Sequence, residues 1–401
     1  MCLIPSTLFT LAQLFDREFT VTTFEVDLNT RIIGADTKIY LARAGKKGHL
    51  FGQVLNSKAV GPDLPNLGIN LATGLDGEQQ LESKIKHSRA LSRWLRTSVQ
   101  TRGNRPQDNL EYYNNQPKGP GHAQVEGVVK SYFDLLKQGD VVVIPNPSVF
   151  GDAIIAEILP LQGNIVRIPG LDRYDGYNFD GRRFGHFKEV RMADLPRSVI
   201  DLAKAPTGFA EINNIKIKRR IFQLLYDDYV MDDEFASRII TTKDDFNSFD
   251  STVLNALISM VAENIERLQH QGGNPVLVDL ERAAFMQVDA DDLQVRININ
   301  SPGHIAVIAK TIAPLVVGSI LAVLIAANFD ALAITPQVVV DVTNSQINDI
   351  ADICSHEVGQ LTQSMLRFLS AEPEFQRNCA LLREAHEHTG AHSNFNVEVK
   401  P

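Results

Sequence analysis

The feature that most constrains the fold is a long apolar segment near the C-terminal end. Residues 311–329, TIAPLVVGSILAVLIAANF, contain no charged side chain and are bounded by Lys310 and Asp330. An uncharged run of roughly 18 or more residues is long enough for a transmembrane helix. Such a run is also typical of a helix buried in a core or an oligomer interface. The segment therefore predicts one very apolar helix within 305–329, either in a membrane or shielded by protein.

The chain is long enough to form two or three domains. Its 401 residues are 44% hydrophobic and 22% charged, which is typical of a globular protein. The three cysteines suggest no disulfide framework and indicate a reducing, cytoplasmic environment. Because no basic residue precedes Arg17, we interpret the first residues as mature chain and not as a signal peptide.

Charge is distributed unevenly along the sequence. The net charge is −9, yet basic residues outnumber acidic ones over 1–220, and acidic residues dominate 221–401. Acidic surfaces repel phosphate, so we expect any nucleic-acid contact in the N-terminal part. We divide the chain into a lead segment (1–35), a first domain (36–215) and an acidic second domain (221–401).

Residues 78–100 are predicted to form a basic amphipathic helix. Leu81, Ile85, Leu91 and Leu95 recur at helical spacing between charged residues. The basic residues repeat at intervals of three and four, which puts them on one face, where they suit a phosphate backbone. The alternative is a solvated face whose charges are balanced by the acidic C-terminal part. The four residues of this basic face are Lys86, Arg89, Arg93 and Arg96.

Short apolar runs follow this helix and are separated by turn residues. Four of these runs each predict a strand, and their spacing favours a small barrel or sandwich. The runs are VVVIP, AIIAEIL, NIVRIPG and FGHFKEVRMADLP. Aromatic side chains lie before and between these strands. Such residues can form a pocket that stacks a planar base, or they can pack over the barrel mouth. The main candidates are Tyr132, Tyr174, Tyr177 and Phe179.

Metal and catalytic motifs are incomplete. His386, His388 and His392 could bind a metal ion, but their spacing matches no closed zinc pattern, so we favour a polar tail. Asp279 and Glu281 follow an apolar run, as in a metal-dependent nuclease, but no lysine follows in the required place. We therefore predict no cofactor and keep a diverged nuclease as an alternative.

Part of the chain resembles a known family of sensor domains. Arg43, Gly45 and Gly48 match an opening strand-turn motif, and Gly139-Asp140 precedes the strand 141–144. The closing strand has His186, Val190 and the LPRS of 195–198. Over about 36–215 these elements resemble the PUA-like (EVE-like) domains attached to Mrr-type restriction enzymes and prokaryotic defence proteins. Lys188 departs from the pattern, since a second arginine often stands there.

The resemblance implies a small β-barrel with helices that senses a modified base or nucleotide-like ligand. It implies that Arg43, Lys46 and His186 lie at the ligand pocket with the aromatic residues. The fold class expected is α+β: this barrel, followed by a mainly helical α/β domain. We thus expect a defence-type sensor of nucleic acid or a nucleotide. Residues 221–401 would be its effector or homo-oligomerisation part. Membrane association through 311–329 is one option for this part. The other alternative is a non-enzymatic oligomeric scaffold.

Overall fold

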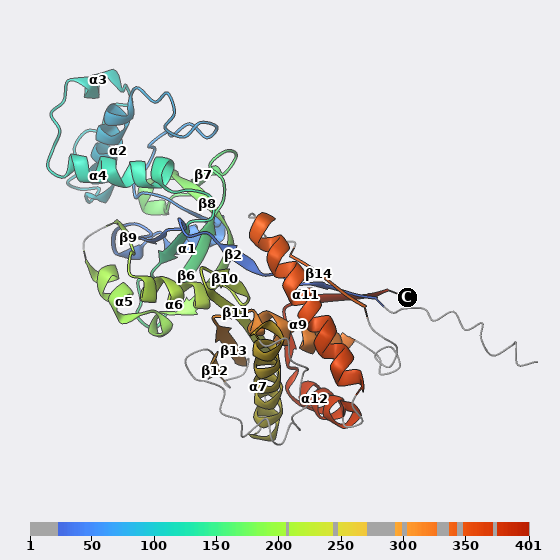
Figure 1. The fold of residues 1–401 in the computed structure, drawn as a ribbon. Helices are drawn as coiled ribbons and strands as arrows, with labels where there is room; N and C mark the ends of the chain where they lie inside the picture. The colour runs from blue at the N-terminus through green and yellow to red at the C-terminus, as the bar shows by residue number, and fades with distance from the viewer. Residues whose placement is uncertain are drawn as a thin grey trace, which may run out of the picture. The chain divides into compact units, whose positions relative to one another are not determined.

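A computed structural model places the chain in two compact units (Figure 1). The continuous unit comprises residues 36–226, and the split unit comprises residues 23–35 with 227–400. Each unit contains helices and strands around its own apolar core, so the predicted α+β class is confirmed. The structure describes residues 23–205, 208–243, 248–270, 293–298, 303–326, 337–342, 348–371 and 375–400.

The continuous unit is built on a curved, half-barrel sheet. Its strand order is β4-β8-β6-β5-β3-β9, with β7 beside β8. The long strand β8 pairs with β4 and β7 through its first residues and with β6 through its last, which joins the two parts of the sheet. All pairs are antiparallel except β3 with β5. The strands are β3 (Ile39–Ala42), β4 (Ala59–Val60), β5 (Val141–Ile144), β6 (Asp152–Ile158), β7 (Ile165–Ile168), β8 (Phe179–Arg191) and β9 (Phe209–Glu211).

The four predicted strands are present as β5 to β8. All four residues of β5 are buried, as expected of a continuous apolar run inside a sheet. The turn before it is fixed by Asp140, whose carboxylate accepts backbone hydrogen bonds from Lys38 at 2.9 Å and Lys137 at 2.8 Å. Gly139 supplies the left-handed backbone that this turn needs, with φ 83°.

Helices surround this sheet in two groups. Figure 1 shows α2, α3 and α4 at one end of the unit, and α5 and α6 at the other. The predicted basic helix is α2, which buries Ile85, Leu91 and Leu95. The helical segments are α1 (Phe51–Ser57), α2 (Leu81–Arg96), α3 (Glu111–Asn114), α4 (His122–Lys130), the π-helical turn η3 (Ser131–Leu135), α5 (Arg197–Lys204) and α6 (Ile215–Leu225), with short 3₁₀ turns η2 (Lys46–Gly48), η4 (Asp172–Tyr174) and η5 (Met192–Asp194).

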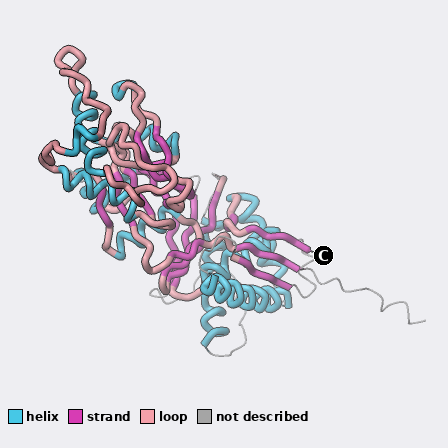
Figure 2. Tube along the Cα trace, turned by 90° about the horizontal axis from the view of Figure 1, so that it is seen from above, coloured by secondary structure: helices cyan, strands magenta, loops and turns pink. Residues whose placement is uncertain are grey.

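The split unit contains two sheets, and residues from both ends of the described chain pair within it (Figure 2). One sheet has the order β14-β1-β16, where β1 is parallel to β14 and antiparallel to β16. The other has the order β12-β13-β11-β10-β2, with β15 beside β11. The strands are β1 (Thr23–Asp27), β2 (Arg31–Ile33), β10 (Tyr229–Met231), β11 (Glu234–Thr241), β12 (Leu293–Asn298), β13 (Gly303–Ala309), β14 (Gln337–Asp341), β15 (His392–Ser393) and β16 (Asn396–Lys400).

The range 305–329, for which we predicted one apolar helix, contains the end of a strand and a shorter helix. Residues 305–309 belong to β13, and the helix α9 covers Ala313–Ala326, with residues 313–324 buried. Its fourteen residues span about 21 Å, less than the ~30 Å of a hydrocarbon core. No helix in the described part of the chain is long and apolar enough to cross a membrane. Around α9 lie α7 (Ser248–His270), α11 (Asn348–Ala371) and α12 (Phe375–Thr389).

Candidate ligand-binding cavity

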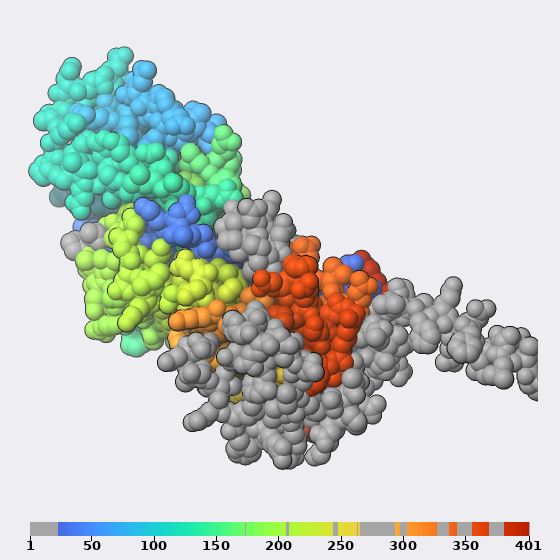
Figure 3. All heavy atoms as spheres, in the orientation of Figure 1, coloured from blue at the N-terminus to red at the C-terminus, as the bar shows by residue number. Residues whose placement is uncertain are grey.

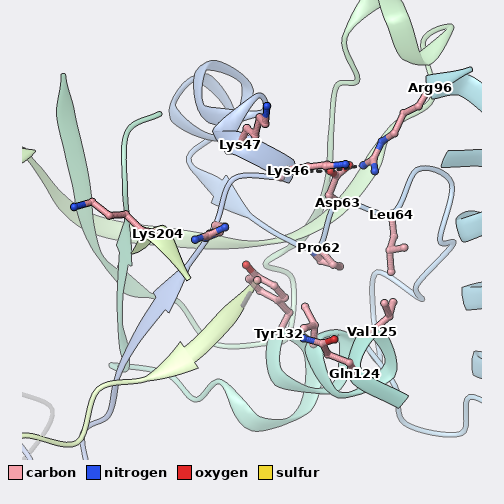
Figure 4. Close-up of a pocket in the computed structure, with 14 residues that line it drawn as sticks. Lys46, Lys47, Pro62, Asp63, Leu64, Arg96, Gln124, Val125, Tyr132 and Lys204 are labelled. Carbon is pink, nitrogen blue, oxygen red and sulfur yellow. Dashed lines mark hydrogen bonds and ion pairs between the residues drawn. The ribbon is translucent and has the colours of Figure 1, made fainter. Parts of the chain in front are cut away.

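The continuous unit contains a cavity of about 630 Å³ between its sheet and its helices. Sites for small molecules commonly have volumes of roughly 300–1,000 Å³. The lining comes from the turn after β3, the loop before α2, and the helices α2, α4, η3 and α5 (Figure 4). The lining residues are Arg43, Gly45, Lys46, Lys47, Pro62, Asp63, Leu64, Arg96, Gln124, Val125, Val128, Tyr132, Lys204 and Gly208.

The turn that carries Lys46 and Lys47 depends on its glycines. Gly45 and Gly48 have φ angles of 75° and 70°, in the left-handed region that favours glycine. A Cβ atom on Gly45 would lie 2.9 Å from the ring of His49, so a side chain there would also clash. The tight turn leaves both lysines exposed at the rim of the cavity. No hydrogen bond of either amine is found within the described residues.

Asp63 connects the turn to the helix α2. Its Oδ2 accepts hydrogen bonds from the backbone N–H of Lys46 at 2.9 Å and from the Arg96 guanidinium at 2.7 Å. Its Oδ1 accepts the Tyr174 hydroxyl at 3.3 Å, and the same hydroxyl lies 2.7 Å from Nε2 of His49. Tyr174 is buried, so it supports Asp63 from behind and does not line the cavity.

The cavity lining carries a strong positive charge. Arg43, Lys46, Lys47, Arg96 and Lys204 face a single acidic lining residue, Asp63. The Arg43 guanidinium also donates hydrogen bonds to the carbonyl groups of Ala203 and Ala205, which ties β3 to α5. Burial lowers the pKa of Arg43 from its usual value. A lining of this kind favours an anionic ligand.

Tyr132 contributes a polar group with no protein partner. Its side chain is only 1% exposed, and its hydroxyl has no hydrogen-bond partner in the described structure. Figure 4 shows this hydroxyl directed toward the cationic side chains. Burial raises the pKa of Tyr132, so the hydroxyl stays protonated and available as a donor. Because buried polar groups are nearly always hydrogen-bonded, the orphan hydroxyl indicates a missing partner.

The position of Tyr132 is set by a buried arginine. Arg182 on β8 donates to the carbonyl oxygens of Tyr132 at 3.3 Å, Leu136 at 3.1 Å and Leu159 at 2.7 Å. These bonds hold the π-helical turn η3 against the sheet. The Tyr132 ring also packs on Phe209, with ring centroids 4.8 Å apart. Turns of this type often occur at functional sites.

The other predicted ligand residues lie outside this lining. Phe179 is buried, with its ring edge-on to Tyr174 at 5.1 Å. Tyr177 lies under the guanidinium of Arg105 at 5.7 Å. His186 stacks on Tyr226 and places Nε2 3.0 Å from the carbonyl oxygen of Leu225. Each of these side chains thus contacts other residues of the continuous unit and is absent from the lining of the first cavity.

The basic face of α2 is divided between two cavities. Arg96 lines the first cavity, whereas Lys86, Arg89 and Arg93 line a second cavity of about 510 Å³. Lys86 pairs with Glu82 of the same helix at 2.6 Å. Within the continuous unit, two of the four charges are thus paired, Lys86 with Glu82 and Arg96 with Asp63.

The three candidate metal-binding histidines do not form a metal site in the described part of the chain. Nδ1 of His386 and of His392 each lie 2.7 Å from a backbone carbonyl oxygen. His388 lies 3.7 Å from Asp250. The described residues contain no group of three or more side chains placed to hold a metal ion. Asp279 and Glu281 lie outside the described residues.

Sequence reasoning missed several residues of the first cavity. Asp63 lies in the loop GPDLP, and Lys204 ends α5, so neither belongs to a periodic pattern. Gln124 and Val125 are on α4, far from the basic turn in sequence. The one local signal was the carboxylate of Asp63 in a Gly- and Pro-rich loop, since such loops often carry functional groups.

Comparison with known proteins identifies no relative: no family model, curated protein or solved structure matches this chain.

Proposed function

We propose that the continuous unit is a PUA-like sensor that binds a nucleic acid or a nucleotide-like ligand in the first cavity. One observation carries the proposal. The same cavity is lined by five cationic residues and by Tyr132, whose buried hydroxyl has no hydrogen-bond partner in the described structure. The cations suit a phosphate group, and the hydroxyl can donate to a base or sugar oxygen. The apolar residues Pro62, Leu64, Val125 and Val128 offer walls for a planar ring.

The half-barrel sheet and the basic turn after β3 support the PUA-like assignment. The resemblance to defence-associated sensors extends the proposal to the whole chain. The continuous unit would read the ligand, and the split unit would act as the effector or oligomerisation part. In the split unit, α9 packs against α7, α11 and β11, so this unit has a packed core and is able to serve either role.

A direct test uses the full-length chain and isothermal titration. The ligands are the four nucleoside monophosphates and mixed-sequence DNA and RNA oligonucleotides. Tyr132→Phe removes only the hydroxyl, and a lost hydrogen bond of about 0.5–1.5 kcal/mol predicts affinity about 2- to 12-fold weaker. Replacing Lys46 and Lys47 with Glu should weaken binding more strongly and reduce its dependence on salt.

Lys137→Glu is the matched control, since Lys137 is exposed and lines neither cavity. It should bind like the unmodified chain. The proposal fails if none of these ligands binds, or if the Lys46/Lys47 and Tyr132 variants bind as tightly as the control.

A further inference from the structure

The second cavity lies beside the first, and two helices contribute to both. From α2, Arg96 lines the first cavity and Arg93 the second. From α4, Gln124 lines the first and His122 the second. Figure 3 shows the segment from α2 to α4, coloured light blue to turquoise, at the surface of the continuous unit. A ligand that extends beyond the first cavity along α2 would therefore reach the second.

The second cavity is lined by four cationic residues and no acidic one. These are Lys86, Arg89, Arg93 and Arg105. Lys86 donates to the carbonyl oxygens of Tyr113 and Gln116, so it fastens the loop after α3. Arg89 donates to the carbonyl oxygen of Pro120 at 2.6 Å, which fastens the same loop. These bonds shape the wall, and the charge of Lys86 is in addition offset by Glu82.

Arg93 differs from these neighbours. Its side chain is exposed, and no hydrogen bond or ion pair of its guanidinium is found in the described structure. Arg105, by contrast, is paired with Asp108 at 3.0 Å. Arg93 is thus the cation in this cavity that is free to meet an incoming anion.

His122 gives an independent sign of a ligand. Its side chain is 2% exposed, and neither ring nitrogen has a hydrogen-bond partner among the described residues. The closest carboxylate, that of Glu126, is 3.9 Å from Nε2, beyond hydrogen-bond range. The residue lines the cavity and begins α4, whose N-terminus has no side-chain cap and carries partial positive charge.

Tyr112 adds an aromatic surface to the cavity. It is 49% exposed and lies edge-on to Tyr113, with ring centroids 5.2 Å apart. Exposed aromatic rings beside cationic side chains are the groups with which proteins hold single strands, because bases stack on the rings. Along α2, Lys86 and Arg96 are about 15 Å apart at 1.5 Å per residue. A strand laid along the helix could therefore place more than one phosphate against this face.

We propose that the second cavity binds the backbone of a single-stranded nucleic acid whose neighbouring nucleotide occupies the first cavity. Arg93 contacts a phosphate, Tyr112 stacks a base, and His122 donates to a phosphate oxygen at the cavity floor. The inference rests on the proposed function of the first cavity and specifies its ligand as a polymer. It distinguishes a strand from a free nucleotide.

The experiment titrates the full-length chain into fluorescein-labelled, mixed-sequence single-stranded 12-mers of DNA and RNA. Arg93→Glu should weaken binding about 10-fold or more and reduce the slope of log affinity against log salt by about 0.7 for each phosphate lost. Tyr112→Ala should weaken binding about 5- to 150-fold, as expected for one stacked base. Arg93→Lys should keep most of the salt dependence, and Lys137→Glu should change nothing.

The outcomes separate this inference from the proposed function. If Arg93→Glu and Tyr112→Ala have no effect while the Lys46/Lys47 variant binds weakly, the inference is overturned and the first cavity keeps its function. The opposite pattern overturns the function of the first cavity and the placing of a nucleotide there, while it supports the second cavity as a strand site. Displacement of the strand by millimolar inorganic phosphate at constant ionic strength would assign a free anion to the cavity and overturn the inference. Absence of any binding overturns both.

Discussion

Arg96 lies 2.7 Å from Asp63, and this pair joins the basic helix to the loop that borders the first cavity. The contact crosses 33 positions of sequence. It uses one of the four basic residues that the sequence assigned to phosphate binding. Arg96 thereby organises the cavity rim, and Asp63 offsets one of the positive charges around it.

Asp63→Asn is expected to strengthen binding of an anionic ligand. The amide oxygen can still accept the Lys46 N–H, but the negative charge is gone. Because solvent and salt screen charges at the cavity rim, we expect the affinity to rise about 2- to 5-fold at low salt. This gain should shrink as salt is added. Loss of the partly exposed ion pair between Asp63 and Arg96 should lower the free energy of unfolding by about 1 kcal/mol. Titration at two salt concentrations measures the gain, with exposed Asp76→Asn as the control; weaker binding would contradict the prediction.

Arg182→Met should destabilise the continuous unit. The substitution leaves three carbonyl oxygens without their buried donor, and we expect a loss on the order of 3 kcal/mol. Trp94, the one tryptophan of the chain, lies on α2 and reports the unfolding of this unit in urea. The neighbouring Arg183 is exposed, so Arg183→Met is a matched control. Equal midpoints for the two variants would show that Arg182 does not hold η3.

The split unit should lose stability as pH rises from 4 to 7. Burial raises the pKa of Asp228 from 3.8 to about 7, although hydrogen bonds from Ser237 and the backbone of Arg238 oppose the shift. Above pH 3.8 the unfolded chain releases this proton while the folded unit retains it. The free energy of unfolding therefore falls through this window, by at most about 4 kcal/mol at 1.36 kcal/mol per unit.

Asp228→Asn should remove this pH dependence, since the amide stays neutral. Urea unfolding followed by far-ultraviolet circular dichroism at pH 5 and pH 8 measures it, with Trp94 fluorescence separating the continuous unit. Asp232→Asn is the control: Asp232 is exposed, with φ 52°, a backbone conformation that asparagine adopts readily. A slope that persists unchanged in Asp228→Asn would assign the effect to another group.

Gly318→Ala should destabilise the split unit through α9. An added Cβ atom would lie 2.6 Å from the Phe395 ring and 2.9 Å from Oγ of Ser237. Overpacking of this kind costs about 1–3 kcal/mol. Gly359→Ala in α11 is the matched helical control, because its Cβ would lie at an ordinary 3.5 Å from Val340. Thermal unfolding by circular dichroism compares them; equal transitions would show that α9 does not pack as tightly as its contacts indicate.

Local patterns in the sequence were enough to predict β5 to β8 and the basic helix of the continuous unit. The run Val141–Ile144 and the amphipathic spacing in Leu81–Arg96 are signals of burial that depend on neighbouring residues alone. The apolar segment was harder to interpret, because hydrophobicity does not distinguish a protein core from lipid. The described helix covers Ala313–Ala326.

The cavity was predictable only in part. Arg43, Lys46 and Tyr132 were selected, and all three line it. Asp63 and Lys204 were not, because their roles depend on contacts between distant loops and helix ends. The sequence likewise placed β1 and β2 in a separate lead segment. In the structure, Thr23 pairs with Gln337 and Arg31 with Tyr229, and no local pattern indicates partners so distant in sequence.

The pairing of β1 with β14 and β16 has a consequence for biosynthesis. A ribosome releases β1 early, but both partner strands emerge only after residues 337–400 have been translated. Residues 36–226 contain all the strands of their own sheet, so this unit can fold while the nascent chain is still growing. The first strand of the split unit must meanwhile remain unpaired, and in that interval its exposed edges are a natural target for chaperones.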